Sequence, residues 1–426
     1  MSTASAQGPS ANASTAAHGG VRRVVVTGVG LVTALGADAG STWEGLVAGR
    51  SAVRVLDEID MTGEKVTAAG MVHLDVATAL AARLPSDIRD RTARFVHFAA
   101  SAAHEALGQA GRPHLENPDR FGVIAGVGIG VPHPSEGYRV GPTSIIKVMP
   151  NGAAAWISIL EGLRGPSLSC STACASGAHA IGVAFDQIRL GRATGHVAGG
   201  VDTVITKDVL RAYAWMRALN TAKDEEPTTM SRPFDATRRG FVLGEGAGFL
   251  VLEEREHAIA RGAKILAELR GFGASSDAYN IVAMPPEGDG MVRAMRSAID
   301  DAGLSPDAIA YVSAHGTSTK MNDKEETHAI RRVFGAHADR LLVSSQKSMI
   351  GHAMGGAGAI EAAVTVLSIV HQTATPTINL KTPDPECDLD YVPNVARKAT
   401  IGAAMSNSFG FGGHNSAMIF AHPDLP

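Results

Sequence analysis

The sequence is poor in cysteine, in aromatic residues and in charged residues, and each shortage excludes a class of protein. Three cysteines in 426 residues cannot form a disulfide framework, so we expect a protein of the reducing cytoplasm. No uninterrupted apolar run reaches about 18 residues, which argues against a membrane-spanning helix. Charged residues make up 19% and the net charge is −4, which argues against nucleic acid as a general partner.

Common cofactor and metal motifs are also missing. The glycines of VRRVVVTGVGLVTALG (21–36) do not match G-x-G-x-x-G, so a dinucleotide site is not predicted. No CxxC or HExxH spacing occurs, and Cys387 lies far from the other two cysteines, so we expect no metal site. The composition that remains, 45% apolar with 48 glycines, is typical of a globular protein with many turns.

Strand and helix patterns alternate along the chain. Residues 1–20 are rich in Ala, Ser and Thr and are expected to form a disordered leader, not a signal peptide. The rest favours an α/β fold with a largely parallel sheet. The alternation runs twice, which predicts two similar halves, 21–262 and 263–423. Strands are predicted within 21–36, 119–130, 195–205, 244–254, 263–275, 308–316, 340–345 and 400–421, helices within 93–111 and 352–372, and a strand–helix unit over 167–191.

One short stretch, SCSTACASGAHAIG (169–182), contains two of the three cysteines. Apolar residues at helical spacing from Ile181 onward predict a helix that begins close to Cys174. A thiol at a helix N-terminus faces unpaired N–H groups, which should lower its pKa and favour the nucleophilic thiolate. Cys170 belongs to the preceding strand and gains none of this. Free cysteines are usually buried fillers, so position alone leaves a reactive Cys174 and an inert one equally open.

Two histidines stand at predicted strand ends, where ligands gather in α/β sheets. His315 follows a strand in SAHGTST (313–319), and His352 lies with Lys347 in SSQKSMIGHAMGGAGAIE (344–361), which ends on Glu361. Any single histidine is more often structural than catalytic. A cysteine, two histidines, a lysine and an acid together favour nucleophilic thiol catalysis.

Five motifs resemble, in order, those of the elongating β-ketoacyl-acyl carrier protein synthases. They are STACASG, SRPFDATRRGFVLGEGAG, AHGTST, QKSMIGHAMGGAGAIE and SNSFGFGG, and the resemblance covers about residues 22 to 421. It implies the thiolase-like fold, two similar βαβαβαββ halves in a five-layered arrangement, commonly dimeric. It also implies an acyltransferase that joins an acyl group to malonyl-acyl carrier protein with loss of CO2. No cofactor is bound permanently, and 4'-phosphopantetheine arrives on the acyl carrier protein.

The resemblance also implies roles for the central residues. Cys174 would be the acylated nucleophile, and His315 and His352 would stabilise the enolate oxygen as charge develops. The backbone N–H groups of Cys174 and Phe411 would form the oxyanion hole. Lys347, held near Glu361, would support the site electrostatically.

Five further positions match residues around the family's substrate path. Thr317 and Thr319 match the hydroxyls that hold the phosphopantetheine arm. Phe411 also matches the gate between the acyl pocket and the thiol, and Phe241 would pack beside the cysteine and exclude water. Arg217 matches a surface arginine that meets the acidic carrier protein.

Departures from the pattern leave pathway and partner open. Asn280 and His414 replace residues common in relatives, and 126–156 is shorter than the usual loop beside the acyl pocket and dimer contact. A degradative thiolase would need a second cysteine in FGFGGHN, and an initiating synthase would have asparagine where His352 stands. The alternatives that remain are a homodimeric fatty-acid enzyme and the catalytic subunit of a polyketide heterodimer with a chain-length factor. A non-condensing partner subunit is disfavoured by Cys174.

Overall fold

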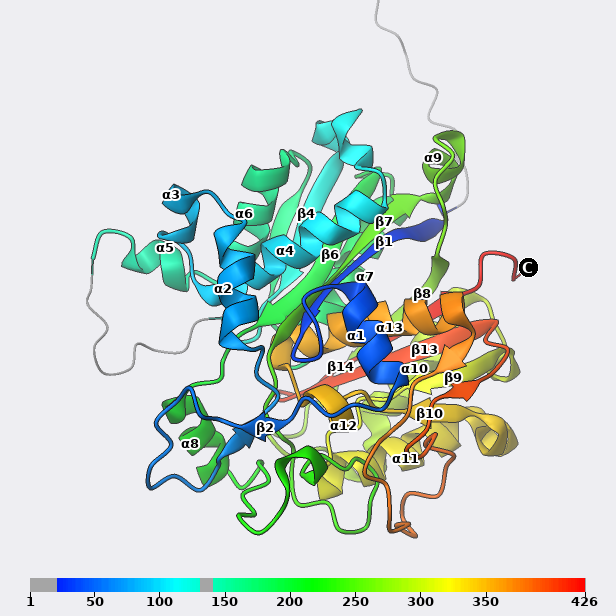
Figure 1. Ribbon diagram of the computed structural model, residues 1–426. Helices are drawn as coiled ribbons and strands as arrows, with labels where there is room; N and C mark the ends of the chain where they lie inside the picture. Colours follow the sequence, from blue (N-terminus) through cyan, green and yellow to red (C-terminus); the bar gives the residue numbers. More distant parts are fainter. Residues whose placement is uncertain (1–20, 131–140, 426) are drawn as a thin grey trace, which may run out of the picture.

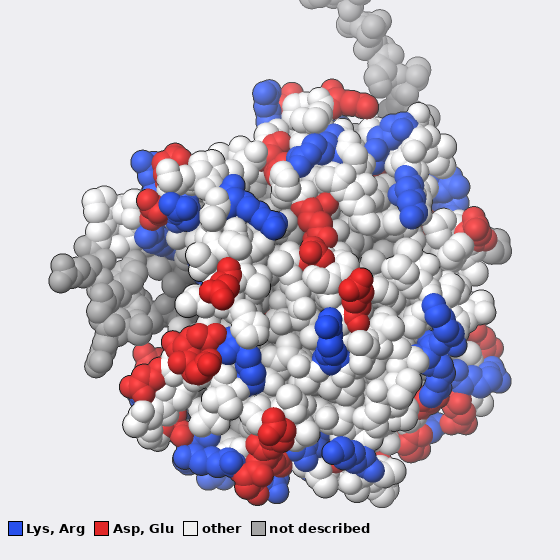
Figure 2. Space-filling view, in the orientation of Figure 1, with Lys and Arg blue, Asp and Glu red and all other residues white. Residues whose placement is uncertain are grey.

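The computed structural model describes residues 21–130 and 141–425. The predicted leader, 1–20, and the centre of the shortened loop, 131–140, lie outside these residues. Figure 1 shows the strands gathered in the centre of the molecule with helices on both sides of them. Figure 2 shows Lys and Arg mixed with Asp and Glu over one face, with wide uncharged areas between them.

Ten strands pair in one continuous order, β10-β9-β13-β14-β8-β1-β7-β6-β4-β5. The five strands of each half are contiguous in this order, and β1 pairs with β8 where the halves meet. Those of the first half are β1 (Val24–Thr33), β4 (Phe121–Gly126), β5 (Ser167–Cys170), β6 (Gly195–Asp202) and β7 (Gly246–Glu254). Those of the second half are β8 (Ala267–Ser276), β9 (Ile309–Ser313), β10 (Leu342–Ser344), β13 (Ala403–Gly410) and β14 (His414–Ala421).

The two halves repeat the same topology. Counted along the chain, the strands of each half lie in the order first, fifth, fourth, second, third. The strand prediction therefore found the right segments, and the duplicated α/β fold is confirmed. The division between residues 262 and 263 stays a prediction.

The sheet is mixed, so the expectation of a largely parallel sheet was wrong. β4 pairs in parallel with β5 and β6, and β9 pairs in parallel with β10 and β13. The last strand of each half turns back against its predecessor: β7 is antiparallel to β6, and β14 is antiparallel to β13. A tight hairpin joins β13 to β14, and such a short connection permits only antiparallel pairing.

Two helices, α7 (Ser176–Arg189) and α13 (Ala357–His371), pack between the strands of the two halves, since each contacts strands of both. The outer faces carry α4 (Arg94–Gln109) and α6 (Gly152–Glu161) on one side and α10 (Asp289–Ala302) and α11 (Lys320–Phe334) on the other. This is the five-layered arrangement that the resemblance implied. The other helices are α1 (Ala39–Val47), α2 (Leu74–Ala82), α3 (Ser86–Arg89), α5 (Ser144–Val148), α8 (Lys207–Trp215), α9 (Arg255–Ala260) and α12 (Lys347–Ile350), and the short strands are β2 (Arg54–Val55), β3 (Ala68–Ala69), β11 (Thr373–Ala374) and β12 (Arg397–Lys398).

The helix predicted over 352–372 begins later than expected, at Ala357. Gly351 and Met354 have positive φ of 72° and 47°, which a right-handed helix cannot contain, so 352–356 form a turn that leads into α13. The stretch Met354–His371 has the length and hydropathy of a membrane span, but 89% of it is buried inside the protein. It is a core helix.

Candidate active site

The first element of the site is the turn between β5 and α7. Cys170 ends β5 and α7 begins at Ser176, so Cys174 lies two residues before the helix, as the periodicity predicted. Ala173 adopts a left-handed φ of 50°, which turns the chain sharply before Cys174. Ser176 holds the turn closed: its hydroxyl donates to the Ala173 carbonyl at 2.6 Å and accepts from the Thr172 N–H at 2.8 Å.

The C-terminal hairpin presses against this turn at Gly410. A Cβ atom at position 410 would lie 2.7 Å from the Thr172 carbonyl oxygen and 3.2 Å from the Cys174 nitrogen. No larger residue fits without moving the turn. The close approach brings the next residue, Phe411, to the thiol.

The prediction of a lowered cysteine pKa was wrong for the free protein. Cys174 is 7% exposed, and burial raises the pKa of its thiol to about 12. The positive charge of Lys347 and the backbone N–H groups of Phe411 and Cys174 act in the opposite direction. Sequence reasoning counted the helix N-terminus and missed the desolvation that outweighs it.

His315 lies just beyond β9, with its side chain 2% exposed. The N–H groups of His315 and Gly316 each donate to the carboxylate of Glu326 at 2.8 Å, which fixes the backbone. Burial and the nearby Lys347 charge lower the pKa of His315 well below its usual value, so the ring is neutral. Lys347 Nζ lies 3.3 Å from His315 Nδ1. Because an ammonium group only donates, Nδ1 accepts and the ring proton sits on Nε2.

His352 faces His315 edge to face, with ring centroids 5.3 Å apart. The backbone N–H of His352 donates to the Val242 carbonyl at 2.8 Å, and the backbone carbonyl of His352 accepts from the Gly244 N–H at 2.9 Å. The Phe241 ring packs against it at 5.5 Å. Burial lowers the pKa of His352 well below its usual value. Two neutral imidazoles can donate N–H groups to a developing oxyanion without bringing a charge that must be desolvated.

Lys347 and Glu361 form a buried ion pair behind the histidines. Burial raises the pKa of Glu361 to about 7, and the ammonium group of Lys347 opposes that rise. The pair leaves a positive charge close to His315 and Cys174. Glu361 therefore lies beside the lysine, as the resemblance implied.

A cavity of about 290 Å³ lies beside the thiol and the two imidazoles. Cys174 and both histidines line it, together with four of the residues expected along the substrate path and the exposed Arg217 at its rim. Lys347 and Glu361 do not line it and act from behind. The complete lining is Cys174, Met216, Arg217, Ala218, Phe241, Val282, Met284, His315, Thr317, Thr319, Lys320, Met321, Asn322, His352, Met354, Phe409 and Phe411.

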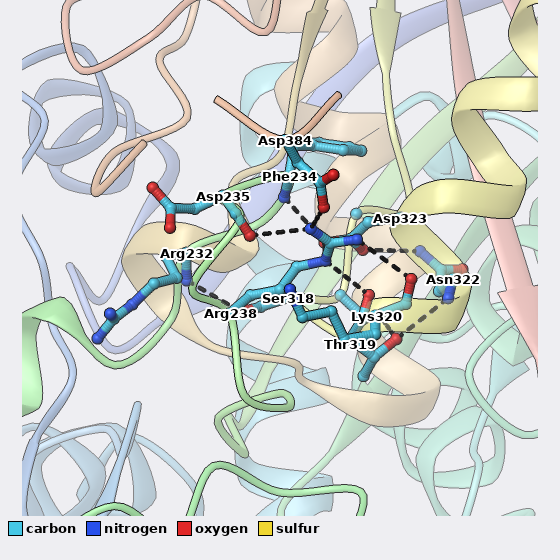
Figure 3. A network of polar contacts seen from close by, with 12 residues as sticks. Arg232, Phe234, Asp235, Arg238, Ser318, Thr319, Lys320, Asn322, Asp323 and Asp384 are labelled. Atoms are coloured by element: carbon cyan, nitrogen blue, oxygen red, sulfur yellow. Dashed lines mark hydrogen bonds and ion pairs between the residues drawn. The ribbon is translucent and has the colours of Figure 1, made fainter. Parts of the chain in front are cut away.

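The two threonines of the lining share a hydrogen bond of 2.9 Å between the Thr317 and Thr319 hydroxyls. Figure 3 shows the buried Arg238, whose guanidinium contacts the backbone of this turn. Its guanidinium donates to the carbonyls of Thr319 and Lys320, each at 3.1 Å, and forms ion pairs with Asp323 and Asp384. Arg238 therefore positions the hydroxyls at the cavity mouth.

Comparison with known proteins agrees with this geometry. The profile for the β-ketoacyl synthase N-terminal domain matches residues 21–258, and that for the C-terminal domain matches 266–381. The chain is 42% identical over 410 residues to 3-oxoacyl-acyl-carrier-protein synthase 2 of Synechocystis, covering 94% of this chain and 98% of that protein. The chain belongs to the β-ketoacyl synthase family. It is an acyl-transferring condensing enzyme.

Two solved ketosynthases share the fold of this synthase. One is the ketosynthase in the AntDE:AntF complex, a type II polyketide acyl-carrier protein with its ketosynthase bound to the hexaketide, at 34% identity and a TM-score of 0.84, covering 95% of this chain and 100% of that one. The other is the ishigamide ketosynthase/chain length factor, at 33% identity and a TM-score of 0.85, covering 94% of this chain and 99% of that one. The resemblance inferred from the motifs is confirmed.

Sequence reasoning missed two residues that shape the synthase's site. Asp202 ends β6, fully buried, and accepts from the N–H groups of Gly130 and Gly355, both at 2.7 Å, and of 128 and 129. Burial raises its pKa to about 6. Met354, next to Gly355, places its Sδ 4.0 Å from Cys174 Sγ. An acid at the end of an apolar strand, GGVD, was the available signal for Asp202.

Within the described residues no group of three or more His, Cys, Asp or Glu side chains is placed to hold a metal ion.

Proposed function

We propose that Cys174 carries the growing acyl chain as a thioester and that the enzyme extends it with malonyl-acyl carrier protein. The observation that carries this proposal is the cavity shared by Cys174, His315 and His352. Their sequence separation is large, and nothing but a common reaction site requires a thiol and two neutral imidazoles on one small cavity.

In the first step the Cys174 thiolate attacks the carbonyl carbon of an acyl thioester. The carbon–sulfur bond to pantetheine breaks, and the departing pantetheine sulfur takes up the proton that Cys174 lost. The N–H groups of Cys174 and Phe411 stabilise the oxyanion of the intermediate, which agrees with their effect on the thiol. Lys347 favours the thiolate through its charge. Phe411, half-buried at the cavity, acts as the gate to the acyl pocket.

In the second step malonyl-carrier protein loses CO2. The bond to the carboxylate carbon breaks and its electron pair forms an enolate, whose oxygen receives N–H donors from His315 and His352. The enolate carbon attacks the acyl thioester, the bond to Cys174 sulfur breaks, and the thiolate is regenerated. Phe241, 4% exposed, keeps water from the reactive carbon, and Glu361 anchors Lys347.

The substrate arrives on a carrier protein with a 4'-phosphopantetheine arm. Thr317 and Thr319, at the cavity mouth, have hydroxyls suited to the amides of that arm. Arg217 is exposed at the rim and meets an acidic carrier surface. The AntF-bound ketosynthase supports the carrier as partner. The small number of cysteines supports a cytoplasmic enzyme.

The enzyme also needs a partner along the outer edge of β5. In the part of the chain that the structure describes, no strand pairs with that side of β5, and Leu168 is 45% exposed. Ile159 on α6 and Ile145 on α5 are 64% and 70% exposed. The unpaired N–H and C=O groups of an open strand edge can pair with a strand of another chain, and apolar neighbours favour that contact. We propose that the partner is a second copy of this chain, and a chain-length factor, as in the ishigamide protein, is the alternative.

The test is reconstitution with acyl-carrier and malonyl-carrier protein and detection of the β-ketoacyl product by mass. The wild-type protein alone should form product, and Cys174→Ala should not. Product that appears only after a chain-length factor is added would select the heterodimer. No product from any acyl donor in either arrangement would overturn the proposal.

A further inference from the structure

The feature that the proposed reaction leaves unused is the hydroxyl of Tyr213 on α8. Its only hydrogen-bond partner among the described residues is a thioether, Met354 Sδ, at 3.8 Å. Sulfur in a thioether is a weak acceptor. Tyr213 is half-buried, and a phenol that is removed from water normally reaches a stronger acceptor.

This hydroxyl lies close to the nucleophile. Met354 Sδ lies 4.0 Å from Cys174 Sγ and 3.8 Å from the Tyr213 oxygen. The distance from the Tyr213 oxygen to Cys174 Sγ therefore cannot exceed the sum of these two contacts. Burial raises the pKa of Tyr213, and charge on Cys174 raises it further, which agrees with that proximity. Tyr213 also packs edge to face against Phe241 at 5.6 Å, which fixes the ring.

The side chains around the thiol and the phenol form one apolar cluster. It contains Leu56, Val66, Ala69, Met71, Cys174, Val204, Ile205, Leu210, Leu219, Phe241, Leu243 and Met354, with Tyr213 packed against it. A hydroxyl beside these apolar side chains has few polar neighbours, so an oxygen brought into the cluster would give it a better acceptor than the thioether.

The side chain of Met354 can move aside so that such an acceptor replaces its sulfur beside the Tyr213 hydroxyl. Its backbone is held on both sides, by the hydrogen bond from the Gly355 N–H to Asp202 at 2.7 Å and by the turn around His352. Its side chain is unbranched and flexible. An acyl chain on Cys174 that displaces the thioether would meet the phenol next.

We propose that Tyr213 is a specificity determinant whose hydroxyl donates a hydrogen bond to an oxygen on the acyl chain held by Cys174. The site would then favour chains with a keto or hydroxyl oxygen on about the fifth carbon over saturated chains of the same length. This deepens the proposed function and rests on it, because it requires an acyl group on Cys174.

The experiment is a competition between two N-acetylcysteamine thioesters, hexanoyl and 5-oxohexanoyl. Their reacting carbonyls are alike, since the second oxygen is remote from the thioester. Intact mass of the protein gives the ratio of the two acyl groups on Cys174. One additional hydrogen bond predicts a preference of about five-fold for the oxo chain in the wild-type protein.

Tyr213→Phe should bring the ratio close to one. Tyr279→Phe is the matched control, because Tyr279 is 61% exposed, and it should retain the wild-type ratio. Met354→Leu, which removes the competing thioether acceptor, should also retain the preference. Equal rates in the wild-type protein, or a preference that survives in Tyr213→Phe, would overturn the proposal. If carrier-bound acyl groups also fail to label Cys174, the proposed function fails, and this proposal fails with it.

Discussion

The turn after β5 and the turn after β10 occupy equivalent places in the two halves. Each follows the third strand of its half and leads to one of the two buried central helices, α7 or α13. The first carries Cys174, and the second carries Lys347 and His352. Duplication of the fold thus brings two equivalent turns to one cavity, which Cys174 of the first turn and His352 of the second turn both line.

The two turns differ in what surrounds them. Cys174 belongs to an apolar cluster that raises its pKa and can accept an acyl chain. Lys347 forms an ion pair with Glu361, and its Nζ lies 3.3 Å from His315 Nδ1. The second turn therefore supplies the positive charge of Lys347 and the imidazole of His352. The proposed reaction therefore divides between the halves: the apolar half would hold the acyl group, and the half with Lys347 would supply the charge and the N–H donors.

The outer edges of the two third strands differ as well. The edge of β10 is covered by the chain itself, because the Val343 N–H donates to the Asp390 carbonyl at 2.8 Å. The edge of β5 is uncovered in the described residues, and Ser167, Leu168 and Ser169 are exposed. One half covers its sheet edge with its own chain, and the proposed partner would cover the other edge.

The largest effect is expected from the histidines of the second half. His315→Ala and His352→Ala should each slow condensation by about 10² to 10³-fold, because each removes a donor to the enolate oxygen. The measurement is product formation from enzyme already acylated on Cys174. His422→Ala, an exposed histidine, is the control. A loss under ten-fold for both would contradict the assigned roles.

Lys347→Met should destabilise the fold in a pH-dependent way. The variant removes the charge that lowers the pKa of Glu361, so this pKa rises above about 7, against about 4.3 in an unfolded chain. The folded state then keeps a proton that the unfolded state has released, and stability falls as pH rises through neutrality. We expect a loss of about 3 kcal/mol at pH of about 8 and a smaller loss at pH of about 5.5.

Urea unfolding at the two pH values measures this effect. The double variant Lys347→Met/Glu361→Gln removes the buried acid and should lose the additional pH dependence. If the free energy of unfolding changes with pH equally in the single and double variants, Lys347 does not control the pKa of Glu361.

Substitutions at the sheet edges are expected to have the smallest effect on the reaction rate, but they should change the oligomeric state. Leu168→Lys on the open edge of β5 should convert a dimer to monomers, because a two-fold interface brings the two new charges together. Leu342→Lys on the covered edge of β10 should leave the dimer intact. Light scattering on the eluting peak measures the mass. A wild-type monomer, or a Leu168→Lys dimer, would contradict the assignment of the β5 edge.

Most of the fold could be predicted from the sequence, because strands and helices of this protein keep their apolar periods. The mixed sheet could not, since β7 pairs with the distant strands β1 and β6, and the prediction for 400–421 did not resolve the local hairpin that turns β14 back on β13. The predicted helix start indicated Cys174 and the predicted strand ends indicated both histidines, and the order of the motifs agreed with these candidates. The raised pKa of Cys174, the four N–H donors on Asp202 and the contact of Met354 with the thiol arise from packing, which no spacing in the chain records.

The central claim is that Cys174, and not Cys170 four residues earlier, carries the acyl group. The most direct measurement is intact mass after incubation with a short acyl-carrier protein, for the wild type, Cys174→Ala and Cys170→Ala. The account predicts one added acyl group on the wild type and on Cys170→Ala, and none on Cys174→Ala. An acyl group that remains on Cys174→Ala would contradict it.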